Sequence, residues 1–176
     1  MPAAVFLVLC AFFARPLHAS EAGQYLSVPD FLSGAFAQAE PTTKVFWLNA
    51  ELKRQIKELT GRQFPLLRVR YWQSGRRTAW ILDEIGKEMP ITIGVVVEEG
   101  AIQQLRILAF RESRGWEVRH PFFTKQFDGL RLDSSSVLDG RVDSITGATL
   151  SVRAVTHVAR LALLLAQQVV PEKAAS

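Results

Sequence analysis

The sequence predicts a single α+β domain in which an antiparallel sheet packs against helices. Two patterns carry this prediction: short runs of alternating or β-branched apolar residues separated by turn signals, and longer segments with apolar residues at helical spacing. The length of 176 residues suits one domain, and a chain that is 48% hydrophobic and 22% charged has the composition of a globular protein. We find no internal repeat and no linker in the sequence.

Helices are predicted in three places. Residues 49–60 form the first, because Asn49 is a good cap, Gly61 is a stop signal, and apolar residues recur every three or four positions. Residues 122–127 resemble a short helix that ends at Asp128-Gly129. The last helix covers residues 148–168 and carries an apolar stripe made of Val152, Val155, Ala159, Ala162 and Leu165. A short segment, 28–40, precedes them and is broken at Pro41.

Strands are predicted between these helices. Residues 65–71 alternate, which places Leu67, Val69 and Tyr71 on one face. Ser74-Gly75 is a turn signal, and residues 78–85 are the expected partner strand. Residues 91–97 and 102–110 flank Glu99-Gly100 and form the clearest hairpin in the sequence.

Residues 1–19 differ in kind from the rest. Residues 3–14 are apolar and too short for a bilayer span of ~20 residues, but they have the length of a signal-peptide core, with cleavage expected near Ser20. No Lys or Arg precedes the run, so an uncleaved anchor and a buried core helix stay open as alternatives. We therefore expect a periplasmic or other extracytoplasmic protein, soluble after cleavage and membrane-anchored if the leader is retained. A lipoprotein site at Cys10 is disfavoured by the bulky Leu9.

Several classes of function have little support in the sequence. Cys10 is the only cysteine, so a mature chain without the leader has no thiol for a disulfide or a cysteine-bound metal. The three histidines do not share metal-ligand spacing, and we expect no metal site. The net charge of +4 is dispersed without a run of five like charges, which argues against a nucleic-acid partner.

One segment joins a polar loop to the start of the last helix and has the residues for binding a ligand: Asp143, Ser144, Ile145, Thr146, Gly147, Ala148 and Thr149. The segment is small and polar, it offers three hydroxyls, and it precedes a helix N-terminus, where unpaired N–H groups and the helix dipole favour an anion. It lacks the P-loop pattern, so nucleotide hydrolysis is not indicated. On spacing alone, a phosphate site and plain helix capping both remain open.

This segment resembles the flavinylation motif Asp-x-x-Ser/Thr-Gly-Ala-Thr of the FMN-binding domain family. That family includes the C subunit of the sodium-translocating NADH:quinone oxidoreductase and the G subunit of the Rnf electron-transport complex. The final threonine there is esterified by the FMN phosphate, and a flavin transferase installs it from FAD with Mg²⁺. The resemblance implies one covalent FMN per chain on Thr149, with Asp143, Thr146, Gly147 and Ala148 at the other motif positions and Ser144 inside it.

A second, weaker resemblance lies upstream. The family commonly has a Glu-Thr-Pro-Gly-like turn near the flavin after a hairpin, and Glu112 and Gly115 match it, whereas Ser113 and Arg114 replace the usual Thr and Pro. The resemblance implies that this turn lies near the FMN. Arg114 is either a cation that tunes the flavin or an exposed turn charge. Trp116 either stacks on the flavin ring or belongs to the core, as we expect of the other tryptophans, Trp47, Trp72 and Trp80.

The chain is thus divided into a leader (1–19), N-terminal helices and first strands (20–89) and an FMN-binding region (90–170). The resemblance implies an exported electron carrier that works with a flavin transferase and with a membrane or periplasmic redox partner. We name no catalytic residue. Two alternatives remain open: a flavin-dependent reductase of a small substrate, and a noncatalytic binding or sensory domain without flavin.

Overall fold

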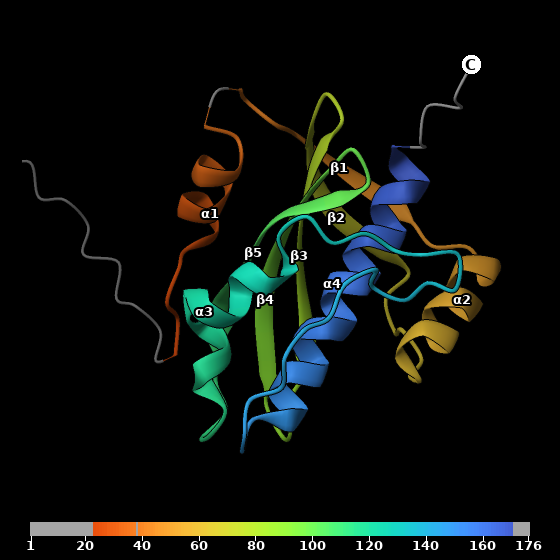
Figure 1. Ribbon diagram of the computed structural model, residues 1–176. Helices are drawn as coiled ribbons and strands as arrows, with labels where there is room; N and C mark the ends of the chain where they lie inside the picture. The colour runs from red at the N-terminus through yellow and green to blue at the C-terminus, as the bar shows by residue number, and fades with distance from the viewer. Residues whose placement is uncertain (1–22, 38, 171–176) are drawn as a thin grey trace, which may run out of the picture.

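The computed structural model describes residues 23–37 and 39–170, so the predicted leader lies outside the described residues. In this part of the chain, five strands form one antiparallel sheet in sequence order (Figure 1). The strands are β1 (Thr42–Trp47), β2 (Arg68–Ser74), β3 (Arg77–Ile85), β4 (Pro90–Glu98) and β5 (Ala101–Phe110). The helices are α1 (Val28–Ala35), α2 (Ala50–Thr60), α3 (Pro121–Thr124) and α4 (Thr149–Val169), with 3₁₀ turns η1 (Trp116–Arg119) and η2 (Lys125–Phe127). The predicted α+β fold is confirmed.

The sheet has helices on both faces. Helices α2 and α4 pack on one face and share the main core with alternate strand residues such as Val69, Tyr71 and Trp80. Helix α1 covers part of the other face through a smaller cluster around Phe31 and Leu108. Figure 1 shows α4 lying along the sheet with α2 beside it and α1 on the far side.

Helix α4 is the central helix of the core. By length and composition it is apolar enough to cross a membrane, yet 61% of its most apolar stretch is buried inside the domain. Its predicted stripe is largely confirmed: Val155, Ala159, Ala162 and Leu165 are buried, and Val152 is partly buried. Since α4 spans the core, its first residue is held in a defined place at the edge of the domain.

Capping and turn residues in the sequence correctly predicted α2 and the β4–β5 hairpin. The Asn49 side chain accepts a hydrogen bond of 2.8 Å from the Leu52 N–H, and Gly61 ends α2 in a left-handed conformation with φ of 71°. The predicted β4–β5 hairpin is confirmed, and its turn places Glu99 and Gly100 at positive φ. The predicted boundaries of α2, α4 and the β4–β5 hairpin are correct to within one residue.

Three predictions need correction. Strand β1 was missed, because at this sheet edge only Phe46 is partly covered, which leaves no apolar alternation to detect. The strand predicted from residue 65 begins at Arg68, and Leu67 is 64% exposed instead of sharing the face of Val69 and Tyr71. The helix predicted over 122–127 starts at Pro121 and is divided between α3 and η2.

The tryptophans also differ from the expectation that all are core residues. Trp80 is fully buried and stacks on Tyr71, with ring centroids 4.7 Å apart. Trp72 is only partly buried, and Trp47 on the edge strand is 64% exposed. Burial therefore depends on how many elements cover each strand, which the residue type does not reveal.

Helix α1 can lie close to the sheet because residue 94 has no side chain. A Cβ on Gly94 would lie 2.6 Å from Phe31 Cζ and 2.8 Å from Leu108 Cδ1, which is closer than carbon atoms pack. Phe31 therefore occupies the space that a side chain at position 94 of β4 would fill. The opposite end of α1 is tied down by Arg77, whose Nη1 donates to the Ala35 carbonyl at 2.9 Å.

We expect Gly94→Ala to destabilise the domain by ~1–3 kcal/mol, because the added methyl group overpacks the α1 contact. Urea unfolding monitored by circular dichroism measures this free energy. Gly34→Ala on α1 is the matched control: no atom lies within 4 Å of its Cβ position, so the change should be neutral or stabilising by up to about 1 kcal/mol. Equal stabilities for the two variants would contradict this account of α1 packing.

Candidate functional site

The first turn of α4 is a helix start without a side-chain cap. Thr149 is its first residue, and the preceding Ala148 occupies the cap position with φ of −117° and ψ of 19°. Within the part of the chain that the structure describes, no side chain caps this end, so the hydroxyls of Ser144 and Thr146 do not serve the capping role that their position also suggested. The first N–H groups of the helix have no intrahelical acceptor and are available to an anion.

The motif loop separates apolar anchors from polar groups. Ile145 packs partly against the core and Ala148 is buried; the Ala148 N–H donates to the Ile145 carbonyl at 3.0 Å. The four remaining side-chain-bearing members are exposed, and these are Asp143, Ser144, Thr146 and Thr149. The buried residues therefore hold the loop in place while the Thr149 hydroxyl stays accessible.

Two contacts outside the motif hold its start. The Asp143 N–H donates to Gln126 Oε1 at 2.7 Å, which ties the loop to η2. The Asp143 carboxylate lies 3.3 Å from the Arg141 guanidinium, but both side chains are well exposed, so this ion pair adds little stability. Gln126 was not predicted as part of the site, because it comes from a separate turn and its sequence context carries no signal.

The upstream turn meets the motif directly. Gly115 has φ of 85° and is buried; a Cβ there would overlap Ser151 Oγ and would lie 3.4 Å from Ala148 Cβ. Both observations require glycine: the left-handed backbone conformation and the close approach to α4. The structure therefore brings the segment 112–116 against the first turn of α4, as the resemblance implied. Ser151, which is buried at this contact, is a further member that the sequence did not reveal.

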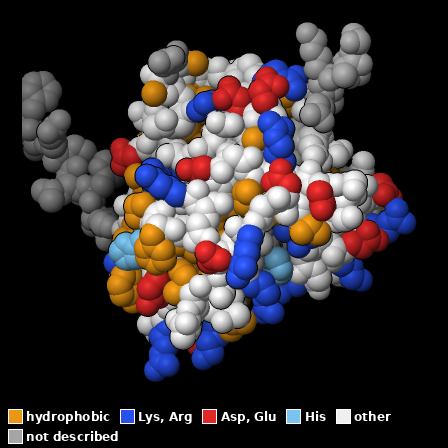
Figure 2. Space-filling model, in the orientation of Figure 1, with side chains coloured by type: hydrophobic (Ala, Val, Ile, Leu, Met, Phe, Trp, Pro, Cys, Tyr) orange, Lys and Arg blue, Asp and Glu red, His pale blue; other side chains and the backbone are white. Residues whose placement is uncertain are grey.

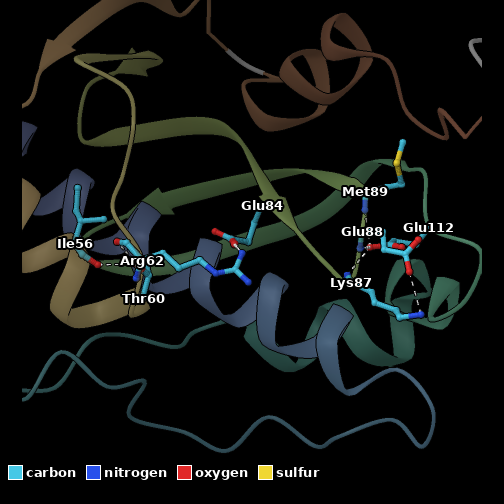
Figure 3. Close-up of polar contacts among 8 residues, drawn as sticks. All are labelled: Ile56, Thr60, Arg62, Glu84, Lys87, Glu88, Met89 and Glu112. Atoms are coloured by element: carbon cyan, nitrogen blue, oxygen red, sulfur yellow. Dashed lines mark hydrogen bonds and ion pairs between the residues drawn. The ribbon is translucent and has the colours of Figure 1, made fainter.

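Glu112 has a positioning role in the described structure. Its Oε1 accepts hydrogen bonds from the backbone N–H groups of Lys87, Glu88 (2.7 Å) and Met89 (3.0 Å), as Figure 3 shows. Three donors on one oxygen fix the β3–β4 turn to the end of β5. Partial burial alone raises the pKa of the Glu112 carboxyl, but the hydrogen bonds from Met89, Glu88 and Lys87 outweigh it and lower the pKa below its usual value.

Arg114 and Trp116 lie on the surface beside this turn. Arg114 is exposed, and Trp116 is 44% exposed, so the core alternative for Trp116 was wrong. The Trp116 ring contacts His120 edge-on at 5.2 Å and lies 5.0 Å from the Arg119 guanidinium. His120 in turn stacks with Phe122, which is 62% exposed.

These side chains form a surface that we call the aromatic patch: Trp116, His120 and Phe122, with Arg119 beside them. Hydrophobic side chains gather over the region of α3 in Figure 2. Turn η1, which carries Trp116 and Arg119, packs against α4. The aromatic patch is therefore continuous with the start of α4.

The residues present fit a phosphate-linked flavin at this place. An exposed hydroxyl at Thr149 is suited to an ester, the uncapped N–H groups of the first turn suit a phosphate, and the missing side chain at Gly115 lets the turn approach. The neighbouring aromatic patch offers a surface on which a planar ring can rest.

Glu112→Gln should cost about 1 kcal/mol of stability at neutral pH, because it removes the charge that strengthens three hydrogen bonds. Since the folded-state pKa of Glu112 is lowered, its contribution is present above the ordinary value of 4.5 and is lost as the pH falls through the folded-state pKa. Thermal unfolding from pH 7 to pH 3 measures both effects.

The difference in stability between wild type and Glu112→Gln should thus disappear at low pH. Glu117→Gln is the control: the Glu117 carbonyl accepts the His120 N–H, which the substitution keeps, and its side-chain carboxylate has no hydrogen-bond partner among the described residues. The stability of this variant should stay within about 0.5 kcal/mol of wild type. A stability difference between wild type and Glu112→Gln that does not change with pH would contradict this account.

No curated protein matches the chain. Residues 86–164 match the family model described as the FMN-binding domain. The matched range begins beside the turn that Glu112 holds, continues through Gly115 and the motif loop, and ends inside α4. It thus contains the elements that the structure brings together around Thr149, and over this range the chain matches the FMN-binding domain family.

Proposed function

We propose that this protein is an exported flavoprotein with one FMN esterified through its phosphate to Thr149, and that it carries electrons for a membrane or periplasmic redox partner. The observation that carries the proposal is the exposed Thr149 hydroxyl at the uncapped first turn of α4, with the Gly115 turn packed against it. A flavin transferase that uses FAD and Mg²⁺ is the partner required for attachment.

The first turn of α4 favours a phosphodiester at Thr149. The free N–H groups point out of the helix end, and the helix dipole stabilises one negative charge there by ~0.3–1 kcal/mol at an exposed site. The ester makes the cofactor permanent, which suits a compartment where free FMN is scarce. The predicted leader (1–19) supports this location.

When bound, FMN supplies one- or two-electron transfer. The chain contributes its surroundings: the exposed Trp116 ring, the Arg119 guanidinium above it, and the exposed Arg114 on the adjoining turn. A cation near the ring favours the reduced, anionic form, and this is the role we assign to Arg114.

A carrier is favoured over an enzyme by the exposure of the motif. Asp143, Ser144, Thr146 and Thr149 are all exposed, and the two cavities of about 780 Å³ and 110 Å³ among the described residues are lined by other segments. The motif instead adjoins an exposed surface, which suits contact with another protein better than enclosure of a small substrate.

We expect covalent flavin to depend on Thr149. Wild-type protein coexpressed with the transferase should give a fluorescent band after denaturing electrophoresis, and Thr149→Ala should give none because the acceptor oxygen is gone. Thr149→Ser restores a hydroxyl and should recover part of the signal, whereas Thr146→Ala should retain most of it. Intact mass reports one FMN and leader cleavage together. A colourless wild type, or a labelled Thr149→Ala, would overturn the proposed attachment.

The carrier role makes a separate prediction. Flavinylated protein should accept electrons from dithionite in a single turnover, yet it should not sustain reduction of small quinones or nitro compounds by NADH above the rate of free FMN at equal concentration. Stopped-flow and steady-state absorbance measure the two rates, with Thr149→Ala as the flavin-free control. A steady-state rate more than about tenfold above free FMN would show a reductase instead.

A further inference from the structure

The large cavity lies where two neighbouring strands separate. Strands β2 and β3 pair only from Tyr71↔Trp80 to Ser74↔Arg77. Beyond that point, residues 68–70 of β2 pair with β1 alone and residues 81–85 of β3 pair with β4 alone. The sheet therefore has a slot between β2 and β3, and the cavity of about 780 Å³ occupies it.

The slot opens on the face of the sheet that α1 covers and extends toward the main core on the opposite face. Val69 and Leu82 line its inner part, and Leu161 of α4 is the only α4 residue that reaches it. Its mouth is on the face of α1, where Val45, Trp72 and Ile81 surround it. Residues 62–66, in the loop before β2, also line it.

Exposed apolar side chains concentrate at this slot. Val28 (37%), Val45 (46%), Leu66 (49%) and Ile85 (43%) all line it and remain open to solvent. An apolar cavity of 300–1,000 Å³ with a few polar groups has the size and lining of a small-molecule site. The apolar part of a ligand would thus find a surface that the fold itself leaves uncovered.

The charges at the slot are unbalanced. Arg62 pairs with Glu84 at 3.0 Å, as Figure 3 shows, and Asp83 accepts a hydrogen bond of 2.6 Å from Thr92. By contrast, Arg68 and Arg70 have no carboxylate within ion-pair distance among the described residues; Arg68 lies against the Trp47 ring at 5.5 Å. The lining thus holds three arginines and two carboxylates, an excess of one positive charge, and Arg68 and Arg70 on β2 are its two arginines outside an ion pair.

We propose that this slot binds an amphipathic organic anion, with its apolar chain or ring between β2 and β3 and its acidic group at Arg68 and Arg70. The site is separate from the flavin motif, since no residue of 112–116 or 143–149 lines it. A small molecule is favoured over a protein partner, because the cavity of about 780 Å³ lies within the size range of small-molecule sites.

The test is a calorimetric titration of the wild-type protein with decanoate, below its micelle concentration, and with neutral decanol. We expect saturable one-to-one binding of decanoate, and decanol should bind about tenfold more weakly because it lacks the charge. Absence of saturable decanoate binding, or equal binding of decanol, would overturn the proposal. So would binding of an acidic peptide alone.

Variants locate the site. Val45 and Arg70 face each other across the β1–β2 ladder, so both lie at the mouth. Val45→Trp should abolish binding of both probes by filling the mouth. Arg70→Gln should weaken the binding of decanoate about fivefold to tenfold and leave the binding of decanol unchanged.

Val137→Trp and Arg54→Gln are matched controls at exposed positions outside the slot, and they should bind decanoate as wild type does. Thermal unfolding establishes that each variant is folded. Unchanged decanoate affinity in folded Val45→Trp and Arg70→Gln would place any binding elsewhere and reject the site.

Discussion

The contact between Gly115 and the first turn of α4 is the constraint on which the site depends. The chain leaves β5, turns back, and rests on Ala148 and Ser151 at a distance that no side chain at position 115 would allow. Because α4 is buried along most of its length, its first turn cannot shift to make room. Gly115 and the buried helix α4 thus bring the turn of residues 112–116 and the motif loop into contact.

The surroundings of this contact divide into anchors and exposed groups. Glu112 holds the β3–β4 turn through three backbone N–H groups, Gln126 holds the start of the motif loop, and Ile145 packs it on the core. Thr149 and Trp116 then remain exposed on a rigid frame. Under the function proposed above, such a site would receive FMN without unfolding and would leave it accessible to a second protein.

The fold could be predicted from the sequence wherever the signal was local. Asn49 and Gly61 mark α2, and Glu99-Gly100 marks the β4–β5 hairpin, because caps and turns depend on residues close in the chain. Strand β1 was not predictable in this way, since an exposed edge strand carries little apolar alternation. The separation of β2 from β3 was equally hidden, because pairing between strands is a property of the whole sheet.

The sequence by itself determined the chemistry of the motif: a hydroxyl at Thr149, small residues before it, and a helix start, all within seven consecutive positions. Only the tertiary structure decided how that chemistry is used. It left the first turn of α4 uncapped, placed Gly115 against it, turned Glu112 toward the β3–β4 turn, and put Trp116 on the surface. The reason is physical: residue types set which bonds are possible, whereas burial and close approach depend on segments that meet only when the chain is folded.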